Sequence, residues 1–291
     1  MQNIAKSIFI ETSYPGVTLG ALILNHGTIL IDAPLRPEDT RSWRAALINQ
    51  HSSTNRMLIN LDAHPDRTFG ARAMECAIIA QQRITQVFRG RPLVFKGQNI
   101  DSGSEWESYG DSVGTRWAVP DITFCEQLNI HWGPPDVILE HHPGPAPGAT
   151  WVIIPDHKIL FVGDLILFNQ PPFLANSDIP AWLESLNLLK SSYKNYTIIS
   201  GRGGAVPYEA IRSQAHVLTS ILKGIEKIAK RHTPLSSMET IIPGIMENIP
   251  HPAHLNEQYV QRLKHGLGQY YLHQYHPTEV ANPAKTAEQD L

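Results

Sequence analysis

The feature that most constrains the fold of this chain is a repeated pattern in which strand-like segments are followed by helical segments. In the first half, short segments rich in Ile, Leu and Val precede an amphipathic helix that Pro37 opens. In the second half, more strand-like segments precede helices, including a long one over 208–230 with apolar residues every three or four positions. Strands followed by helices in two halves are typical of a layered α/β domain.

The pattern predicts individual elements along most of the chain. The predicted strands are 7–11, 17–25, 28–31, 56–61, 122–124, 128–132, 137–141, 150–154, 159–162 and 196–200. The predicted helices are 37–49, 68–76, 181–190 and 208–230. Residues 88–121, rich in Gly, Ser and charge, are expected to form an extended surface loop or a helical lid. We predict a single domain over 1–281, with a helical C-terminal extension from about 208, and a disordered tail over 282–291.

Composition limits the classes of partner. A chain of 291 residues with 42% hydrophobic and 18% charged residues has the composition of a globular protein, and its net charge of −3 gives no basic excess for nucleic acid. Its apolar runs are shorter than the roughly 20 residues that span a bilayer, and its N-terminus does not resemble a signal peptide. Cys76, expected on a core helix, and Cys125 stand outside any CxxC motif. We therefore expect a cytoplasmic protein with neither nucleic-acid nor membrane partners.

The segment that carries candidate chemistry is 58–70, with the sequence Leu-Ile-Asn-Leu-Asp-Ala-His-Pro-Asp-Arg-Thr-Phe-Gly. A predicted strand delivers Asp62, His64 and Asp66 into a turn, and their alternation lets the three side chains point to one side. Carboxylate and imidazole ligands together suit zinc, iron or manganese. A polar turn at the end of a strand is the alternative interpretation at this point.

Four further segments, each next to a predicted strand, extend this signal. They are 32–34 (Asp-Ala-Pro), 142–148 (His-Pro-Gly-Pro-Ala-Pro-Gly), 160–164 (Leu-Phe-Val-Gly-Asp) and 200–204 (Ser-Gly-Arg-Gly-Gly). In this order and spacing the chain resembles the metallo-β-lactamase superfamily from about Gly20 to Gly204. That family's pattern is Asp-Thr/Ala-Gly, Thr-His-x-His-x-Asp-His, Pro-Gly-His-Thr-x-Gly, Leu-Phe-x-Gly-Asp and Pro-Gly-His-Gly. The resemblance implies a four-layer αββα sandwich with hydrolytic, metal-dependent ancestry.

The departures from the family pattern concern the metal ligands. His64, Asp66 and Asp164 keep the residue types that the pattern requires, and Asp62 stands at the position of its first histidine. The other three histidine positions of the pattern hold Arg67, Pro145 and Arg202.

The resemblance implies one impoverished metal position. It would use Asp62, His64 and Asp164 to bind one divalent ion, either zinc, manganese or iron, or no ion at all. His141 or His142, just before the expected histidine position, is a weaker candidate for the missing imidazole.

The other metal position of the family contains both arginines. Arginine offers no lone pair and stays protonated, so it repels a metal ion. We predict that Arg67 and Arg202 pair with Asp66 and Asp164, and that guanidinium charge replaces the charge of the second ion.

Three functions remain open from the sequence, with Asp66, Arg67 and Arg202 as candidate catalytic residues. The first is a hydrolase in which a metal-bound hydroxide attacks an ester, lactone, thioester or amide and Asp66 accepts a proton. The second is a metal-free pseudoenzyme or binding protein whose arginines bind an anionic ligand. The third is a metal-independent catalyst in which the arginines stabilise an oxyanion. The expected partner is a small molecule, and residues 234–276 are expected to cover the site or form a homodimer contact.

Overall fold

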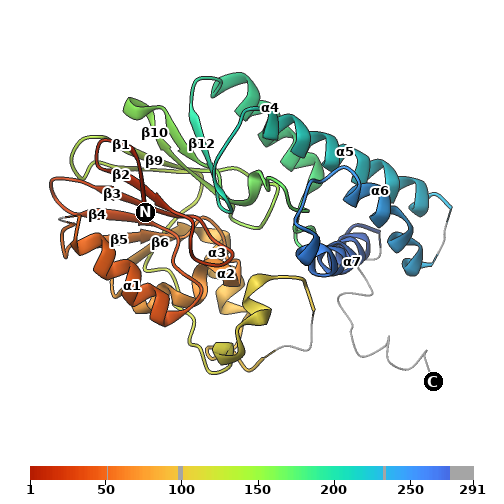
Figure 1. The fold of residues 1–291 in the computed structure, drawn as a ribbon, viewed down its shortest axis with the longest axis horizontal. Helices are drawn as coiled ribbons and strands as arrows, with labels where there is room; N and C mark the ends of the chain where they lie inside the picture. The colour runs from red at the N-terminus through yellow and green to blue at the C-terminus, as the bar shows by residue number, and fades with distance from the viewer. Residues whose placement is uncertain (51, 98–100, 232–233, 276–291) are drawn as a thin grey trace.

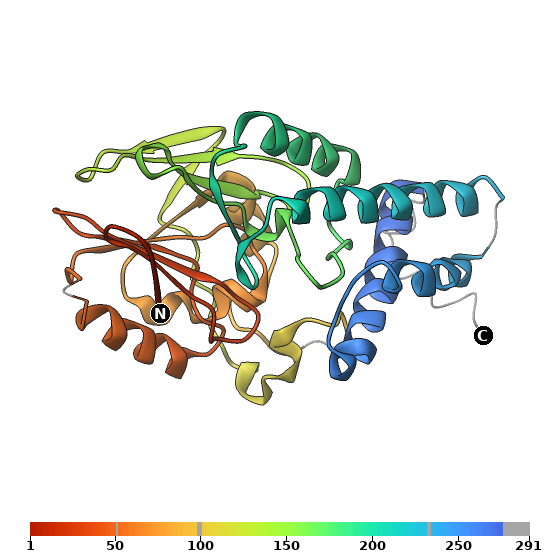
Figure 2. The ribbon, with the colours of Figure 1, turned by 45° about the horizontal axis from the view of Figure 1, so that its top comes forward.

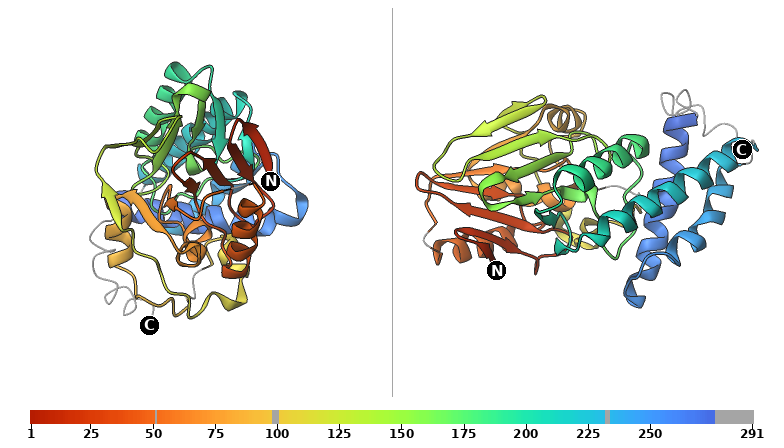
Figure 3. Two further views of the ribbon diagram at one scale, coloured as in Figure 1. Left: turned by 90° about the vertical axis from the view of Figure 1, so that its left-hand side faces the viewer. Right: turned by 90° about the horizontal axis from the view of Figure 1, so that it is seen from above.

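The computed structural model describes residues 1–50, 52–97, 101–231 and 234–275. Two β-sheets pack face to face, and helices cover their outer faces, so the predicted αββα sandwich is confirmed (Figures 1 and 3). The predicted disordered tail, 282–291, lies outside the described residues. Among the helices of the described ranges, none is long and apolar enough to cross a bilayer.

The first sheet combines an antiparallel meander with a parallel half. Its strands, in spatial order, are β1 (Gln2–Ala5), β2 (Ile8–Glu11), β3 (Leu19–Ile23), β4 (Thr28–Ile31), β5 (Arg56–Ile59), β6 (Ala77–Gln81) and β7 (Ile122–Phe124). Strands β1 to β4 pair antiparallel, whereas β4 to β7 pair parallel. The carboxyl ends of β4 and β5 therefore meet at the same edge of the sheet.

The second sheet brings another parallel pair to the same end of the sandwich. Its spatial order is β13 (Gly204–Val206), β12 (Thr197–Ser200), β11 (Ile159–Phe161), β10 (Thr150–Ile154), β9 (Val137–His141) and β8 (Gln127–Ile130). Strands β11 and β12 pair parallel, so the loops after them are also neighbours. Buried aliphatic side chains of both sheets fill the space between them, including Ile31, Ile59, Leu139 and Phe161.

Helices occupy the two outer layers. The first sheet is covered by α1 (Pro37–Ile48), α2 (Pro65–Thr68), η1 (Phe69–Met74) and α3 (Gln82–Arg89). The second sheet packs on α4 (Ile179–Ser192) and α5 (Glu209–Ala229). The helices α6 (Ile242–Met246) and α7 (Asn256–Tyr275) lie beyond the end of the sheets (Figure 2). Short 3-10 helices are η2 (Glu105–Ser108), η3 (Gly110–Ser112), η4 (Pro155–His157), η5 (Gly163–Leu165), η6 (Leu235–Ile241) and η7 (Ala253–Leu255).

Helix α7 packs directly onto the loop that precedes η2. Gly103 has a positive φ of 66°, and a Cβ there would lie 2.5 Å from the carbonyl oxygen of Gln258 and 2.7 Å from the backbone nitrogen of Arg262. A residue without a side chain is therefore required for this approach. The contact joins the C-terminal extension to the segment 101–108.

The region from 65 to 121 differs most from the prediction. The expected helix over 68–76 is instead the short helix α2 followed by η1, which ends at Glu75 with a φ of 54°. The strand β6 and the helix α3 come next and were not predicted, and Cys76 is half-buried before β6, not on a helix. Apolar strand residues buried among other strands lack the alternation that marks an exposed strand, which explains why β6 was missed.

The described parts of the predicted loop segment, 88–97 and 101–121, are largely irregular and share a small aromatic core with η1. An isolated bridge pairs Val94 with Arg116, and η2 and η3 lie between them. Phe95, Trp106 and Trp117 are buried against Phe69 of η1, with ring centroids 4.5 to 6.0 Å apart. Aromatic packing therefore fixes part of this segment beside α2.

Candidate active site

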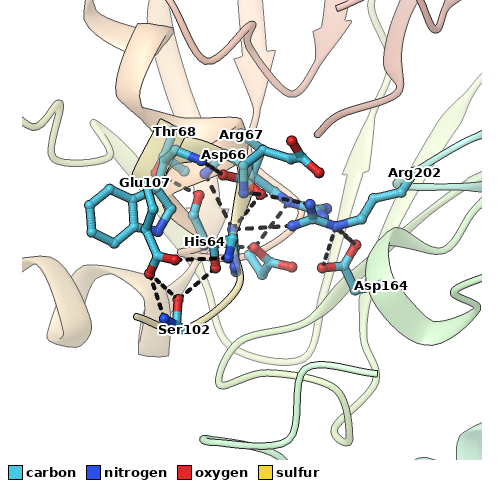
Figure 4. Close-up of polar contacts among 12 residues, drawn as sticks. His64, Asp66, Arg67, Thr68, Ser102, Glu107, Asp164 and Arg202 are labelled. Atoms are coloured by element: carbon cyan, nitrogen blue, oxygen red, sulfur yellow. Dashed lines mark hydrogen bonds and ion pairs between the residues drawn. The ribbon is translucent and has the colours of Figure 1, made fainter. Parts of the chain in front are cut away.

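The candidate site lies where the parallel strands of both sheets end. Asp32 follows β4 and Asp62 follows β5, whereas Asp164 follows β11 and Arg202 follows β12. In Figure 4, Arg202 and Asp164 reach the site from one side, and His64, Asp66 and Arg67 reach it from the loop and helix α2 on the other. The topology thus assembles residues that are up to 170 positions apart in the sequence.

Arg67 is fully buried among three carboxylates. Pro65 occupies the first position of α2, and the side chain of Arg67, two residues later, is 0% exposed. Its Nη1 lies 3.2 Å from Asp32 Oδ2, and its Nε lies 3.2 Å from Asp62 Oδ1. Its Nη2 donates to Asp164 Oδ1. The contact of Nε with Asp62 is an ion pair by distance but not an aligned hydrogen bond.

The guanidinium of Arg67 fits because position 201 is a glycine. A Cβ at Gly201 would lie 2.8 Å from Arg67 Nη1 and 2.9 Å from the backbone carbon of Gly163. Any larger residue would push Arg67 away from the end of β12.

Arg202 joins the two halves of the site. Its Nη1 donates to Asp66 Oδ2 at 2.6 Å, and its Nε lies 3.2 Å from both oxygens of Asp164. Its Nη2 lies 3.2 Å from Nδ1 of His64. One face of the guanidinium covers the ring of Phe173, with Cζ 4.5 Å from the ring centroid.

The surroundings of His64 define its tautomer. The backbone N–H of Asp66 lies 3.2 Å from Nδ1, and Arg202 Nη2 approaches the same atom. Both neighbours are donors, so Nδ1 accepts and the proton of the neutral ring lies on Nε2. Burial, together with the positive charges of Arg202 and Arg67, lowers the pKa of His64 to about 3.

Asp66 is saturated with hydrogen-bond donors. Besides Arg202, it accepts from the backbone N–H of Trp106 at 2.7 Å and that of Glu105 at 3.4 Å. Burial favours the protonated form, but the positive charge and hydrogen bond of Arg202 and the backbone N–H of Trp106 outweigh it and lower the pKa of Asp66. Asp66 is 0% exposed and thus has little capacity to accept a proton from a substrate or water.

The four carboxyl groups divide into two pairs by their pKa values. Burial alone would raise the pKa of all four carboxyl groups. The positive charges of Arg202 and Arg67 nevertheless lower the pKa of Asp164, and Arg202 also lowers that of Asp66. Burial dominates at the other two, raising the pKa of Asp32 to about 7 and that of Asp62 above its usual range. Two ionised carboxylates can therefore balance the two guanidinium groups, leaving the cluster close to neutral.

The structure brings together the six predicted site residues: Asp62, His64, Asp66, Arg67, Asp164 and Arg202. The predicted pairing of the arginines with Asp66 and Asp164 is present, with Arg67 on Asp164 and Arg202 on both. Asp32 also belongs to the cluster and was left out of the predicted site, although its Asp-Ala-Pro motif signalled it. Phe173 had no motif that could have indicated its role.

The two histidines considered as substitute ligands have other partners. His141 Nδ1 lies 2.9 Å from the carbonyl oxygen of Ala149. His142 Nε2 lies 3.0 Å from Glu140, and its ring stacks on Trp151 at 3.7 Å. These contacts fix both rings outside the Asp–Arg cluster, which is formed by Asp32, Asp62, Asp66, Asp164, Arg67 and Arg202.

Comparison with known proteins agrees with this architecture. Residues 63–201 match the model of the metallo-beta-lactamase superfamily. The fold is similar to a metallo-beta-lactamase from Pontibacter korlensis, with 18% identity, a TM-score of 0.57, and coverage of 75% of this chain and 97% of that one. The chain therefore has the metallo-β-lactamase fold. The comparison with curated proteins found no match.

A second similar structure covers more of the chain. The inverting sec-alkylsulfatase Pisa1 from Pseudomonas sp. is 13% identical, with a TM-score of 0.63 over 96% of this chain. The chain spans about half of that protein, 51% of its length. Because so little of this chain is left uncovered, the match must include most of the C-terminal helices. At these identities the likeness shows a common fold.

Members of the superfamily generally bind divalent metal ions. Within the described ranges, no group of three or more His, Cys, Asp or Glu residues is placed to hold a metal ion. Two predicted ligands, Asp62 and Asp164, face Arg67, and Nδ1 of the third, His64, faces Arg202. A divalent cation does not fit this arrangement, because guanidinium groups lie against the donor atoms.

Proposed function

We propose that the protein is a metal-free member of the superfamily that acts as a binding protein without metal-dependent hydrolase activity. The observation that carries this proposal is the position of Arg67, fully buried and in contact with Asp32, Asp62 and Asp164. A metal ion at Asp62 and Asp164 would meet a permanent positive charge at contact distance.

The arrangement also argues against the two catalytic alternatives. A metal-bound hydroxide needs an ion with an open coordination position, and the carboxylates that would hold it are paired with arginine. Oxyanion stabilisation needs donors directed at the substrate, whereas Arg67 and Arg202 direct theirs at Asp32, Asp66 and Asp164. Shared fold with hydrolases does not supply these groups.

The test combines metal content with activity. We expect protein purified without chelator to contain far less than one equivalent of metal, and zinc, manganese and iron(II) to leave its Tm unchanged. We also expect no hydrolysis of a panel of ester, lactone, thioester, amide and sulfate-ester substrates in the presence of these ions. One tightly bound equivalent that is lost in His64→Ala, together with turnover, would instead establish the mononuclear hydrolase.

A small molecule remains the proposed ligand. The homodimer and the cytoplasmic location stay predictions, which sedimentation and localisation experiments can address.

A further inference from the structure

A third buried arginine lies next to the Asp–Arg cluster. Arg262 of α7 is 1% exposed, and its Cζ lies 3.9 Å from the ring centroid of Phe173, the same ring that Arg202 covers. The ring of Tyr259 is 4.9 Å from the same Cζ. Residues 234–276 were expected to cover the site or to form a homodimer contact, and Arg262 of this segment contacts Phe173 beside the site.

Arg262 differs from the other two buried arginines in its partners. Arg67 and Arg202 each contact at least two carboxylates, whereas no ion pair of Arg262 occurs in the described part of the chain. Its Nε and Nη1 donate to neutral acceptors, namely the Gly103 carbonyl, the Gln170 side chain and the Pro171 carbonyl. A buried charge without a countercharge is costly and calls for a specific reason.

One nitrogen of Arg262 has no acceptor in the part of the chain that the structure describes. Nη2 is buried and lacks a hydrogen-bond partner among the described residues. The nearby acids are already engaged: Asp66 accepts from Arg202, and Glu105 Oε1 accepts from Gln258 at 3.1 Å. Burial and the positive charge of Arg202 lower the pKa of Arg262 to about 10, so the group still carries its charge at neutral pH.

A second donor lies against the same ring. The His64 ring centroid is 4.7 Å from that of Phe173, and the side chain is 17% exposed. Its hydrogen bonds within the described chain are all made by Nδ1, so the Nε2–H is left for a ligand or solvent. Because Nδ1 faces two N–H donors, the ring is fixed as a donor at Nε2.

We propose that Nε2 of His64 and Nη2 of Arg262 bind one small oxyanion, a carboxylate, sulfate or phosphate group of the ligand, beside Phe173. One negative charge there would neutralise Arg262 and supply both missing acceptors. Phe173 is half-buried in a segment without regular structure, so its ring is the group that must shift to admit the anion. The proposal rests on the proposed function, because a metal on His64 would compete for that side chain.

The test uses acetate, sulfate and phosphate as probes, each compared with chloride at equal ionic strength. In wild-type protein labelled with ¹⁵N-histidine, His64 should show a protonated Nε2 and an unprotonated Nδ1, and a binding anion should shift the Nε2 signal saturably. A Tm increase with the same anion should follow. Comparison of the three probes identifies whether carboxylate, sulfate or phosphate is preferred.

Two variants on α7 separate ligand binding from packing. Arg262→Met keeps an unbranched side chain against Phe173 and should weaken anion binding at least about tenfold, the loss expected for one charged hydrogen bond. Gln261→Ala removes the neighbouring bond to the Asp101 carbonyl, made at 2.9 Å, and should leave anion affinity unchanged. If Arg262→Met does not fold, the saturable shift of the His64 Nε2 signal in the wild-type protein still tests whether the anion binds.

Equal anion affinity in wild type and Arg262→Met, or no saturable response to any of the three probes, would overturn the proposal. A metal-free protein without anion binding contradicts this inference alone. Metal bound stoichiometrically at His64 contradicts the proposed function as well.

Discussion

Replacing Arg67 by methionine removes a cation that contacts Asp32, Asp62 and Asp164, while it keeps most of the side-chain volume. Removing one partner of a buried ion pair typically costs about 3–5 kcal/mol, because the remaining charge stays desolvated. The cost here falls toward the lower end if Asp32 and Asp62 take up protons, since burial already raises the pKa of both. At about 2 °C per kcal/mol for a chain of this size, Tm should fall by roughly 6–10 °C.

Thermal and urea unfolding followed by circular dichroism measure this loss. The matched control is Arg44→Met, which breaks a surface ion pair of 2.7 Å with the exposed Glu75 and should change the free energy of unfolding by about 1 kcal/mol or less. A double-mutant cycle with Asp164→Asn isolates the coupling between Arg67 and Asp164. If Arg67→Met melts within the error of wild type, the arginine does not compensate the carboxylates and the reasoning fails.

Three further predictions concern the same cluster. The double variant Arg67→His with Arg202→His should gain a zinc-dependent rise in Tm that the Arg67→Met, Arg202→Met variant lacks; equal zinc responses would contradict the charge-replacement hypothesis. Because the folded pKa of Asp32 is about 7 against a usual 3.8, the folded state binds the extra proton between these values, so this group lowers stability as pH rises from about 4 to 7. Asp32→Asn should flatten that slope in urea titrations, and an unchanged slope would refute it. Gly201→Ala should destabilise by about 1–3 kcal/mol in urea titrations because its Cβ would meet Arg67, and a neutral result would show that the loop relaxes.

Sequence reasoning recovered the fold where local patterns were strong. The strands β2 to β4, the strands β8 to β12 and the long helix α5 follow from their apolar periodicity and turn residues, whereas the edge strands β1 and β13 were not predicted. The helix α7 was not predicted, although residues 208 onward were expected to form a helical extension. Its apolar positions pack on other helices, and their spacing alone does not reveal this.

The sequence by itself determined which charges the site contains. Two arginines at positions of metal-binding histidines already excluded an intact two-metal centre, because guanidinium groups remain protonated and donate no electron pair. It also indicated that Asp66 and Asp164 would be their partners. The order of motifs was sufficient for this inference, since motif order reflects the order of strands.

The tertiary structure alone decided how each charge is satisfied. The parallel pairs β4–β5 and β11–β12 bring Asp32 against Arg67. Arg67 is therefore surrounded by the carboxylates of Asp32, Asp62 and Asp164. Folding of α7 across the end of the sandwich places Arg262 on Phe173, where no acidic residue of the described ranges pairs with it. Hydrogen-bond partners and countercharges depend on contacts between residues far apart in the chain, and local sequence does not encode those distances.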